Sequence, residues 1–281
     1  MEMNVAAESL AVLGHEGRLS VFRLLMRRAP QGARPGDIAA ALGLKPATLS
    51  AYLSALEQTG LITARRDGRA IFYSVHIAAT AGLMDYLLAD CCRGRPDICA
   101  PLSHSLLLEE SPMSPRLYNV LFICSGNSAR SIFAEAILAS VGPGKFNAYS
   151  AGTRERSELN PFALELLARN GHDVSGLRSK NIAEFQAADA PVMDFVFTVC
   201  DAAANEECAP WAGQPLTAHW GVADPVKATG TDAEKALDFA RAYAELRRRI
   251  VSFVALPFAE LEKVALQQHL DTLGTDRGAN L

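Results

Sequence analysis

The sequence has no long hydrophobic stretch: no apolar run reaches the about 18 residues that a membrane-spanning helix needs. The N-terminus also lacks the basic and apolar regions of a secretory signal peptide. These absences argue against a membrane protein and favour a cytoplasmic location. In that reducing compartment the six cysteines are expected to serve as metal ligands or redox groups rather than as structural disulfides.

Length and composition predict two soluble domains. The chain has 281 residues, and a domain typically has about 150 residues, so two domains are expected. Hydrophobic residues make up 49% of the chain and charged residues 21%. This composition excludes the disordered, collagen-like and disulfide-scaffold classes. Residues 101–116 contain three prolines and four serines, which is typical of an extended linker. We therefore expect a first domain over residues 1–100, a second domain over residues 117–258 and a C-terminal tail over residues 259–281.

The charge is unevenly distributed along the chain. The net charge is −4, but residues 18–69 contain nine lysines and arginines against three acidic residues. A basic segment on an otherwise acidic chain is typical of a part that contacts the phosphate backbone of a nucleic acid. Charge alone leaves open the alternative that this segment is a solvated helix face.

The pattern of the first domain is that of a winged helix-turn-helix, a mostly α fold with a β-hairpin wing. An apolar helical stripe ends at Gly43, and Pro46 suits the first turn of the next helix. Two short strands are predicted around Asp67-Gly68, a dipeptide that favours a tight hairpin turn. Helix, turn, helix and hairpin in this order predict a DNA-binding domain whose second helix enters the major groove.

The open side of the second helix and the tip of the hairpin carry the candidate DNA-binding residues. Arginines at the tip would hold phosphates, whereas polar side chains on the helix would make specific contacts. The candidates are Lys45, Thr48, Ser50, Tyr52, Ser54, Arg65, Arg66 and Arg69. The pattern alone leaves open a helical protein-interaction domain.

The segment DIAAALGLKPATLSAYLSALEQTGLITARRDGRAIFYS, residues 37–74, resembles the ArsR-type family of metal-responsive transcriptional repressors. The resemblance covers about the first 100 residues. It implies a homodimer on double-stranded operator DNA, paired through the N-terminal helix and the helix that runs from His76. Many members sense metals through cysteines on the first helix of the helix-turn-helix, and this sequence has none there.

Three cysteines follow the predicted dimer helix in the segment DCCRGRPDIC: Cys91, Cys92 and Cys99. Thiolates are the ligands that thiophilic ions prefer, and a pyramid of three thiolates suits trivalent arsenic. Gly94 and Pro96 allow the bend that would bring Cys99 back toward the adjacent pair. A subset of the ArsR-type family has a similar arrangement, which favours arsenite as the effector ligand. A thiol cluster without a ligand, or an incomplete zinc site, is the alternative.

After the linker the pattern becomes that of an α/β domain with a central parallel sheet. An apolar strand is followed by the loop Cys124-Ser125-Gly126-Asn127-Ser128-Ala129-Arg130-Ser131 and by a helix. Backbone N–H groups of such a loop can bind an anion at the positive end of the helix, and Arg130 adds a two-donor fork for an oxyanion. We therefore expect the substrate to be bound by Ser125, Gly126, Asn127, Ser128, Ala129 and Arg130.

The same loop carries a candidate nucleophile. The helix terminus and Arg130 favour the thiolate form of Cys124, and Ser131 can hydrogen-bond its sulfur. The alternative is a degenerate loop that binds anions without reacting. The Cys-x5-Arg-Ser motif resembles that of the low-molecular-weight tyrosine phosphatase fold, from about residue 117 to about residue 258. Two branches use this fold: tyrosine phosphatases, and arsenate reductases coupled to thioredoxin.

Both branches need an acid that protonates the leaving oxygen. Asp224 in HWGVADP matches the position of the family's acid. In the phosphatase branch, tyrosines usually follow this Asp-Pro pair in the sequence. In this chain Val226 and Lys227 follow it.

Cys200 and Cys208 favour the reductase branch, because arsenate reduction needs two electrons whereas phosphate hydrolysis needs one thiolate. The stretch VCDAAANEECAPWAGQPLTAHWG also closely resembles the reductases. The resemblance implies a relay in which Cys124 attacks arsenate, Cys200 attacks the Cys124 adduct and releases arsenite, and Cys208 takes over the disulfide. Thioredoxin is the implied electron donor, and no tightly bound cofactor is expected.

Together, these resemblances predict an arsenite-responsive repressor fused to an arsenate reductase whose product is the repressor's ligand. The main alternative is a tyrosine phosphatase fused to a redox- or metal-sensing DNA-binding regulator. A non-enzymatic alternative is a repressor whose second domain only senses oxyanions.

Overall fold

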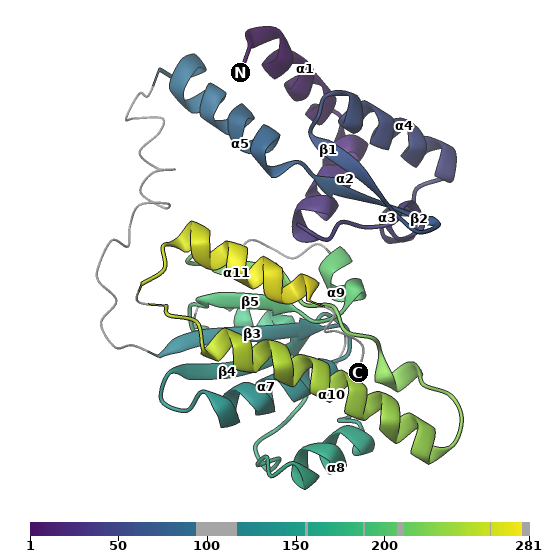
Figure 1. Cartoon of the computed structure of the whole chain (residues 1–281), viewed down its shortest axis with the longest axis vertical. Coiled ribbons are helices and arrows are strands. Elements are labelled where there is room, and N and C mark those ends of the chain that lie inside the picture. The colour runs from purple at the N-terminus through teal and green to yellow at the C-terminus, as the bar shows by residue number, and fades with distance from the viewer. Residues whose placement is uncertain (94–116, 155–156, 188, 207–210, 259, 277–281) are drawn as a thin grey trace. The chain divides into compact units, whose positions relative to one another are not determined.

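The computed structural model describes the chain except for residues 94–116, 155–156, 188, 207–210, 259 and 277–281. The chain divides into two compact units, residues 1–111 and residues 112–281 (Figure 1). The expected linker, residues 101–116, lies outside the described residues. In the part of the chain that is described, no helix is both long and apolar enough to cross a membrane.

Helices make up most of the first unit. Its elements are α1 (Met3–Leu13), α2 (Glu16–Arg27), α3 (Pro35–Leu42), α4 (Pro46–Gln58), β1 (Ile62–Asp67), β2 (Ala70–Val75), α5 (Ile77–Asp85) and the π-helix η1 (Tyr86–Cys91). The boundaries follow the predicted signals: Gly43 caps α3 with a φ of 62°, and Pro46 is the first residue of α4. β1 and β2 pair antiparallel, and Gly68 in their turn has a φ of 59°. The helix expected to run from His76 begins at Ile77 and changes to π geometry at Tyr86.

The core of the first unit fixes α4 against α2. Leu49, Leu53 and Leu56 of α4 are buried, as their spacing at four and three residues predicts. They join a cluster that contains the fully buried Leu24 and Leu25 of α2. Each buried leucine contributes roughly 1.5–3 kcal/mol relative to an exposed one. This packing leaves most of the opposite side of α4 exposed.

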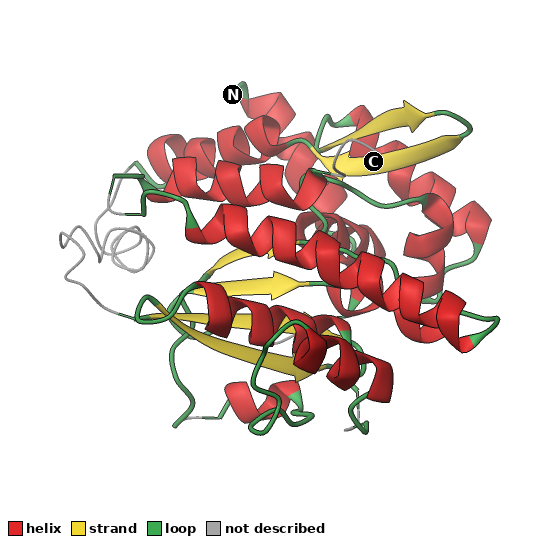
Figure 2. Cartoon of the chain, turned by 60° about the horizontal axis from the view of Figure 1, so that its bottom comes forward, coloured by secondary structure: helices red, strands yellow, loops and turns green. Residues whose placement is uncertain are grey.

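The second unit is an α/β domain. Its elements are β3 (Tyr118–Cys124), α7 (Arg130–Val141), β4 (Phe146–Gly152), α8 (Pro161–Arg169), η2 (Ile182–Phe185), β5 (Phe195–Thr198), α9 (Asp201–Asn205), β6 (Leu216–His219), η3 (Pro225–Lys227), α10 (Asp232–Val254) and α11 (Lys263–Thr275). The strands, drawn as yellow arrows in Figure 2, form a parallel sheet. Their order in the sheet is β4-β3-β5-β6. β3 is buried at nearly every position, as expected for a central strand. The carboxyl ends of all four strands therefore meet at one edge of the sheet.

The C-terminal helix belongs to the core of this unit. The sequence pattern sets residues 259–281 apart as a tail, whereas α11 packs against β6 and buries Leu266 and Leu270. The indole N–H of Trp220 donates to the carbonyl oxygen of Leu270 at 3.0 Å, and its ring stacks on Phe197 with a centroid separation of 4.0 Å. Because residues 263–275 carry no chemical motif, their role is visible only as packing.

Candidate active site

The loop between β3 and α7 stands at the carboxyl edge of the sheet. Cys124 ends β3 and Arg130 begins α7, so residues 125–129 lie at the N-terminus of a 12-residue helix. Asn127 has a φ of 49°, a positive value that asparagine adopts more readily than most residues. Gly152 at the end of β4 packs on the loop, because a Cβ atom there would lie 3.2 Å from the backbone nitrogen of Asn127. Close backbone packing therefore fixes the shape of the loop.

The buried sulfur of Cys124 faces two hydrogen-bond donors. The backbone N–H of Asn127 donates to Sγ at 3.2 Å, and the hydroxyl oxygen of Ser131 lies 2.9 Å from it. The side-chain amide of Asn127 donates to the same hydroxyl oxygen at 2.9 Å, which leaves the Ser131 proton available to the sulfur. Two donors stabilise negative charge on sulfur, which a thiolate nucleophile needs.

Arg130 and Asp224 form an ion pair beside the loop. Nη2 of the buried Arg130 lies 2.9 Å from Oδ2 of Asp224, and Nη1 donates to the carbonyl oxygen of Val222 at 3.2 Å. The other oxygen of Asp224 accepts from the backbone N–H of Val226 at 3.3 Å, at the start of η3. The structure thus brings the predicted acid next to the predicted oxyanion-binding arginine, although 94 positions separate them in the sequence.

Cys200 also lies beside the loop, two residues after the end of β5. Its buried Sγ is 4.0 Å from the hydroxyl oxygen of Ser125 and accepts from the backbone N–H of Ala203 at 3.4 Å. Burial raises the pKa of the Cys200 thiol, and the positive charge of Arg130 opposes this rise. Cys124 and Cys200 are both free thiols. Cys208, the third member of the predicted relay, lies outside the described residues.

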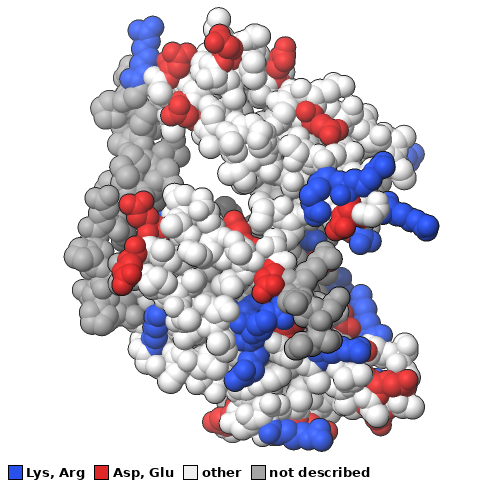
Figure 3. All heavy atoms as spheres, in the orientation of Figure 1, with Lys and Arg blue, Asp and Glu red and all other residues white. Residues whose placement is uncertain are grey.

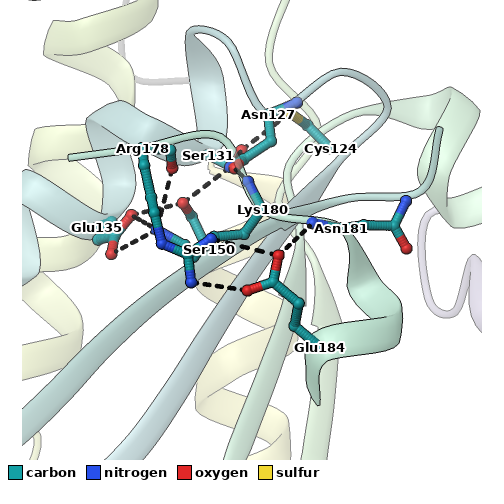
Figure 4. A network of polar contacts seen from close by, with 9 residues as sticks. All are labelled: Cys124, Asn127, Ser131, Glu135, Ser150, Arg178, Lys180, Asn181 and Glu184. Carbon is teal, nitrogen blue, oxygen red and sulfur yellow. Dashed lines mark hydrogen bonds and ion pairs between the residues drawn. The ribbon is translucent and has the colours of Figure 1, made fainter. Parts of the chain in front are cut away.

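A network of polar contacts holds the Asn127 side chain and thereby supports the loop that follows Cys124 (Figure 4). Besides Ser131, the side-chain amide of Asn127 donates to the hydroxyl of Ser150 at 2.8 Å, and Ser150 donates to a carboxylate oxygen of Glu135 at 2.5 Å. The backbone N–H of Lys180 donates to Oδ1 of Asn127 at 2.6 Å. The Lys180 ammonium lies 2.9 and 3.0 Å from the two carboxylate oxygens of Glu135. Every side-chain hydrogen-bonding group of Asn127 therefore has a partner.

The family described as Low molecular weight phosphotyrosine protein phosphatase matches residues 119–267, which is more than half of the chain. The chain belongs to this family.

Curated relatives of the second unit are named arsenate reductases. The arsenate reductase of Halalkalibacterium halodurans is 36% identical over 134 residues, or 48% of this chain and 93% of that protein. The arsenate reductase of Bacillus licheniformis is 37% identical over the same length and with the same coverage. A solved arsenate reductase from Archaeoglobus fulgidus is 26% identical, spans 49% of this chain and 99% of that one, and has a TM-score of 0.39. By sequence, the second unit is homologous to nearly the whole length of the curated reductases.

The first unit has a separate match. The IclR helix-turn-helix domain matches residues 19–66, which contain α3 and α4. The first unit of this phosphatase-family chain therefore contains a helix-turn-helix of the DNA-binding kind. The finer expectation of an ArsR-type repressor is not shown by this match, because it is to a different helix-turn-helix family.

The candidate DNA-binding residues lie mainly on exposed surface. Lys45, Ser50, Ser54, Arg65, Arg66 and Arg69 are exposed, and Thr48 is partly exposed. Basic side chains gather around the hairpin end of the first unit (Figure 3). Tyr52 differs from the others: its ring packs 5.1 Å from the ring of His15, and a Cβ atom at Gly17 would lie 2.6 Å from it. Part of the Tyr52 side chain thus joins α4 to the start of α2.

The predicted arsenite site is described only in part. Cys91 ends the π-helix η1 and is exposed, and Cys92 follows it and is partly exposed. Cys99 lies outside the described residues. Among the residues that are described, no three His, Cys, Asp or Glu side chains converge as metal ligands.

Sequence reasoning missed three polar residues that support the loop, Glu135, Ser150 and Lys180, and a fourth, His219, that contacts residues on both sides of Cys200. Glu135 is four positions after Ser131 on α7, a spacing that places both on one face of a helix. That spacing was the available signal. Ser150 and Lys180 carry no local signal, since their partners are distant in sequence. His219 begins the HWGVADP segment, from which a role was predicted only for Asp224.

Proposed function

We propose that the second unit reduces arsenate to arsenite with three cysteine thiols, and that this activity is fused to an arsenite-responsive repressor. The observation that carries the reductase proposal is the position of the Cys200 sulfur, 4.0 Å from the hydroxyl oxygen of Ser125 in the Cys124 loop. A phosphatase needs one thiolate, whereas a reductase needs a second thiol close enough to displace arsenic from the first. Homology to proteins named arsenate reductase supports the same reaction.

The first step is attack of the Cys124 thiolate on arsenate held by the backbone N–H groups of residues 125–129 and by Arg130. An S–As bond forms and an As–O bond breaks. Asp224, which lies 2.9 Å from Arg130, supplies the proton with which the leaving oxygen departs as water. Ser131 stabilises the sulfur through the contact at 2.9 Å.

In the second step, the Cys200 thiolate attacks the Cys124 sulfur. A disulfide forms, the S–As bond breaks, and its electron pair stays on arsenic, which is reduced from As(V) to As(III) and leaves as arsenite. Cys208 then attacks the Cys200 sulfur and releases the Cys124 thiolate. A dithiol donor, for which we propose thioredoxin, reduces the remaining disulfide and completes the cycle.

The test is arsenate turnover by the full chain with thioredoxin, thioredoxin reductase and NADPH. We expect the wild-type chain to reduce arsenate repeatedly. Either substitution, Cys124→Ser or Cys200→Ser, should abolish arsenate turnover. Cys200→Ser should still hydrolyse an aryl phosphate, since that reaction needs only the Cys124 loop and Asp224. Hydrolysis by the wild-type chain without arsenate turnover would assign the phosphatase function instead. Full turnover by Cys124→Ser would show that the loop only binds oxyanions.

For the first unit we propose a homodimeric repressor of the ArsR type that binds double-stranded operator DNA and takes arsenite as its effector on Cys91, Cys92 and Cys99. Exposed apolar side chains on α1 and α5, such as Leu10 and Met84, support pairing through these helices. The DNA probe is a duplex that the full chain selects from a random pool. We expect arsenite to release it in a gel-shift titration and the triple cysteine-to-serine variant to stay bound. Unchanged affinity of the wild-type chain would contradict the proposal.

A further inference from the structure

A buried histidine lies beside Cys200 and takes no part in the reaction steps given above. His219 ends β6 and is 4% exposed. Its Nδ1 lies 2.9 Å from the hydroxyl oxygen of Thr198 on β5, and its Nε2 lies 2.9 Å from Oδ1 of Asp201 at the start of α9. A carboxylate only accepts hydrogen bonds, so Nε2 carries a proton. The imidazole therefore joins β6 to both β5 and α9.

The two partners of His219 flank Cys200 in the chain. Thr198 is two positions before Cys200 and Asp201 is the next residue. One imidazole thus contacts the side chains of residues on both sides of the cysteine. The Cys200 sulfur itself accepts from the backbone N–H of Ala203, at the first turn of α9. The direction of the Cys200 side chain consequently depends on the position of α9, whose first residue, Asp201, contacts His219.

The backbone at Gly221 packs closely against the contact between the histidine and the aspartate. A Cβ atom at Gly221 would lie 2.5 Å from Nε2 of His219 and 3.0 Å from Oδ1 of Asp201, so no side chain fits there. Gly221 lies in the segment that carries Asp224 and whose Val222 carbonyl accepts from Arg130. The contact between His219 and Asp201 is therefore held in one geometry.

We propose that His219 and Asp201 are positioning residues for Cys200, which they hold in line for the disulfide-forming step of the arsenate reductase that we propose above. In that step the Cys200 thiolate forms a bond to the Cys124 sulfur, and the electron pair of the S–As bond moves to arsenic. Attack on sulfur requires the three atoms to lie nearly in line, so a small displacement of Cys200 slows the step. The attack of Cys124 on arsenate does not involve Cys200 and does not depend on this alignment.

Asp201 is the residue to change, because its side chain is 67% exposed and its replacement leaves no buried gap. We expect Asp201→Ala to lower the rate of Cys124–Cys200 disulfide formation in a single turnover with arsenate by about 10- to 100-fold, as misplacement of a reacting group does. Aryl phosphate hydrolysis and alkylation of Cys124 by iodoacetamide should stay within about twofold of wild type. Asp201→Asn, which can still accept from Nε2, should restore most of the rate.

The matched control is Asp232→Ala, which also removes an exposed aspartate from the first position of a helix, here one that pairs with Lys235 at 3.5 Å. Disulfide formation that is slower in Asp201→Ala than in this control, with unchanged aryl phosphate hydrolysis, supports the proposal. Equal disulfide rates in the two variants, or an equal loss of both reactions in Asp201→Ala, would overturn it. A wild-type chain that forms no disulfide with arsenate would refute the reductase function itself, and the inference with it.

Discussion

The Lys180 side chain is 7% exposed, and its ammonium lies against both oxygens of the Glu135 carboxylate. Lys180→Met leaves this carboxylate buried without its cation, a loss that costs about 3–5 kcal/mol in buried ion pairs. We expect the free energy of unfolding in urea to fall by about this amount, and alkylation of Cys124 to slow because Asn127 loses its support. Lys180→Arg keeps the charge and serves as the matched variant. A methionine variant as stable as wild type would show that the pair contributes no stability.

The pH dependence of the proposed relay follows from the environment of Cys200. Burial raises the pKa of its thiol above the ordinary value of 9.0, so the protonated form predominates at neutral pH. Only the thiolate attacks the Cys124 sulfur, and raising the pH increases its fraction about tenfold per unit below the pKa. We therefore expect single-turnover disulfide formation, measured by mass spectrometry after acid quenching, to accelerate as the pH rises from neutrality past 9.0. A flat rate over this range would contradict the prediction.

Residues of the candidate site were predictable where their chemistry is local in sequence. Cys124, Arg130 and Ser131 lie within eight positions, so spacing alone relates a nucleophile to its oxyanion and hydroxyl partners. Lys180 was not predictable, because its role arises from an ion pair with Glu135, 45 positions away. An isolated lysine in a polar loop carries no sign of burial.

Secondary-structure elements followed the sequence where a glycine or proline marks a boundary. Gly43 and Pro46 delimit α3 and α4, and Gly68 stands in the turn between β1 and β2. Two features were not anticipated: the π geometry of η1 and the packing of α11. The π-helix η1 arises within an ordinary helical pattern, and α11 has buried leucines whose partner is the distant strand β6. Tertiary packing against β6 decides the place of α11, and no local signal in the sequence precedes it.

The hairpin of β1 and β2 gives a prediction for DNA binding at the level of the element. Arg66 is exposed on β1, and a lysine or arginine that contacts one phosphate contributes about one unit to the slope of log K against log salt. We expect Arg66→Ala to weaken binding to all duplex sequences alike and to reduce that slope by about one. Arg241→Ala on α10, whose arginine pairs with Asp238 at 3.1 Å, is the control. A change in sequence preference without a change in slope would contradict a phosphate contact.

At the scale of the whole chain, the two-domain layout predicted from length and composition is confirmed, and each family match falls within one unit. The two units have complementary chemistry in the proposed function. The second converts an oxyanion, which thiols bind poorly, into arsenite, which three thiolates can hold. The first carries the adjacent pair Cys91 and Cys92. Fusion would make one chain respond to arsenate as well as to arsenite.

This coupling predicts that full-length protein bound to its selected duplex releases the DNA when arsenate is added with the thioredoxin system, after a delay set by turnover. Cys124→Ser should not respond to arsenate, because it makes no arsenite, but should release DNA at once when arsenite is added. The Cys91→Ser and Cys92→Ser double variant should reduce arsenate yet stay bound. Fluorescence anisotropy of labelled duplex follows release in all three proteins. Release of the Cys124→Ser protein by arsenate would show that the loop signals by binding an oxyanion, without reduction.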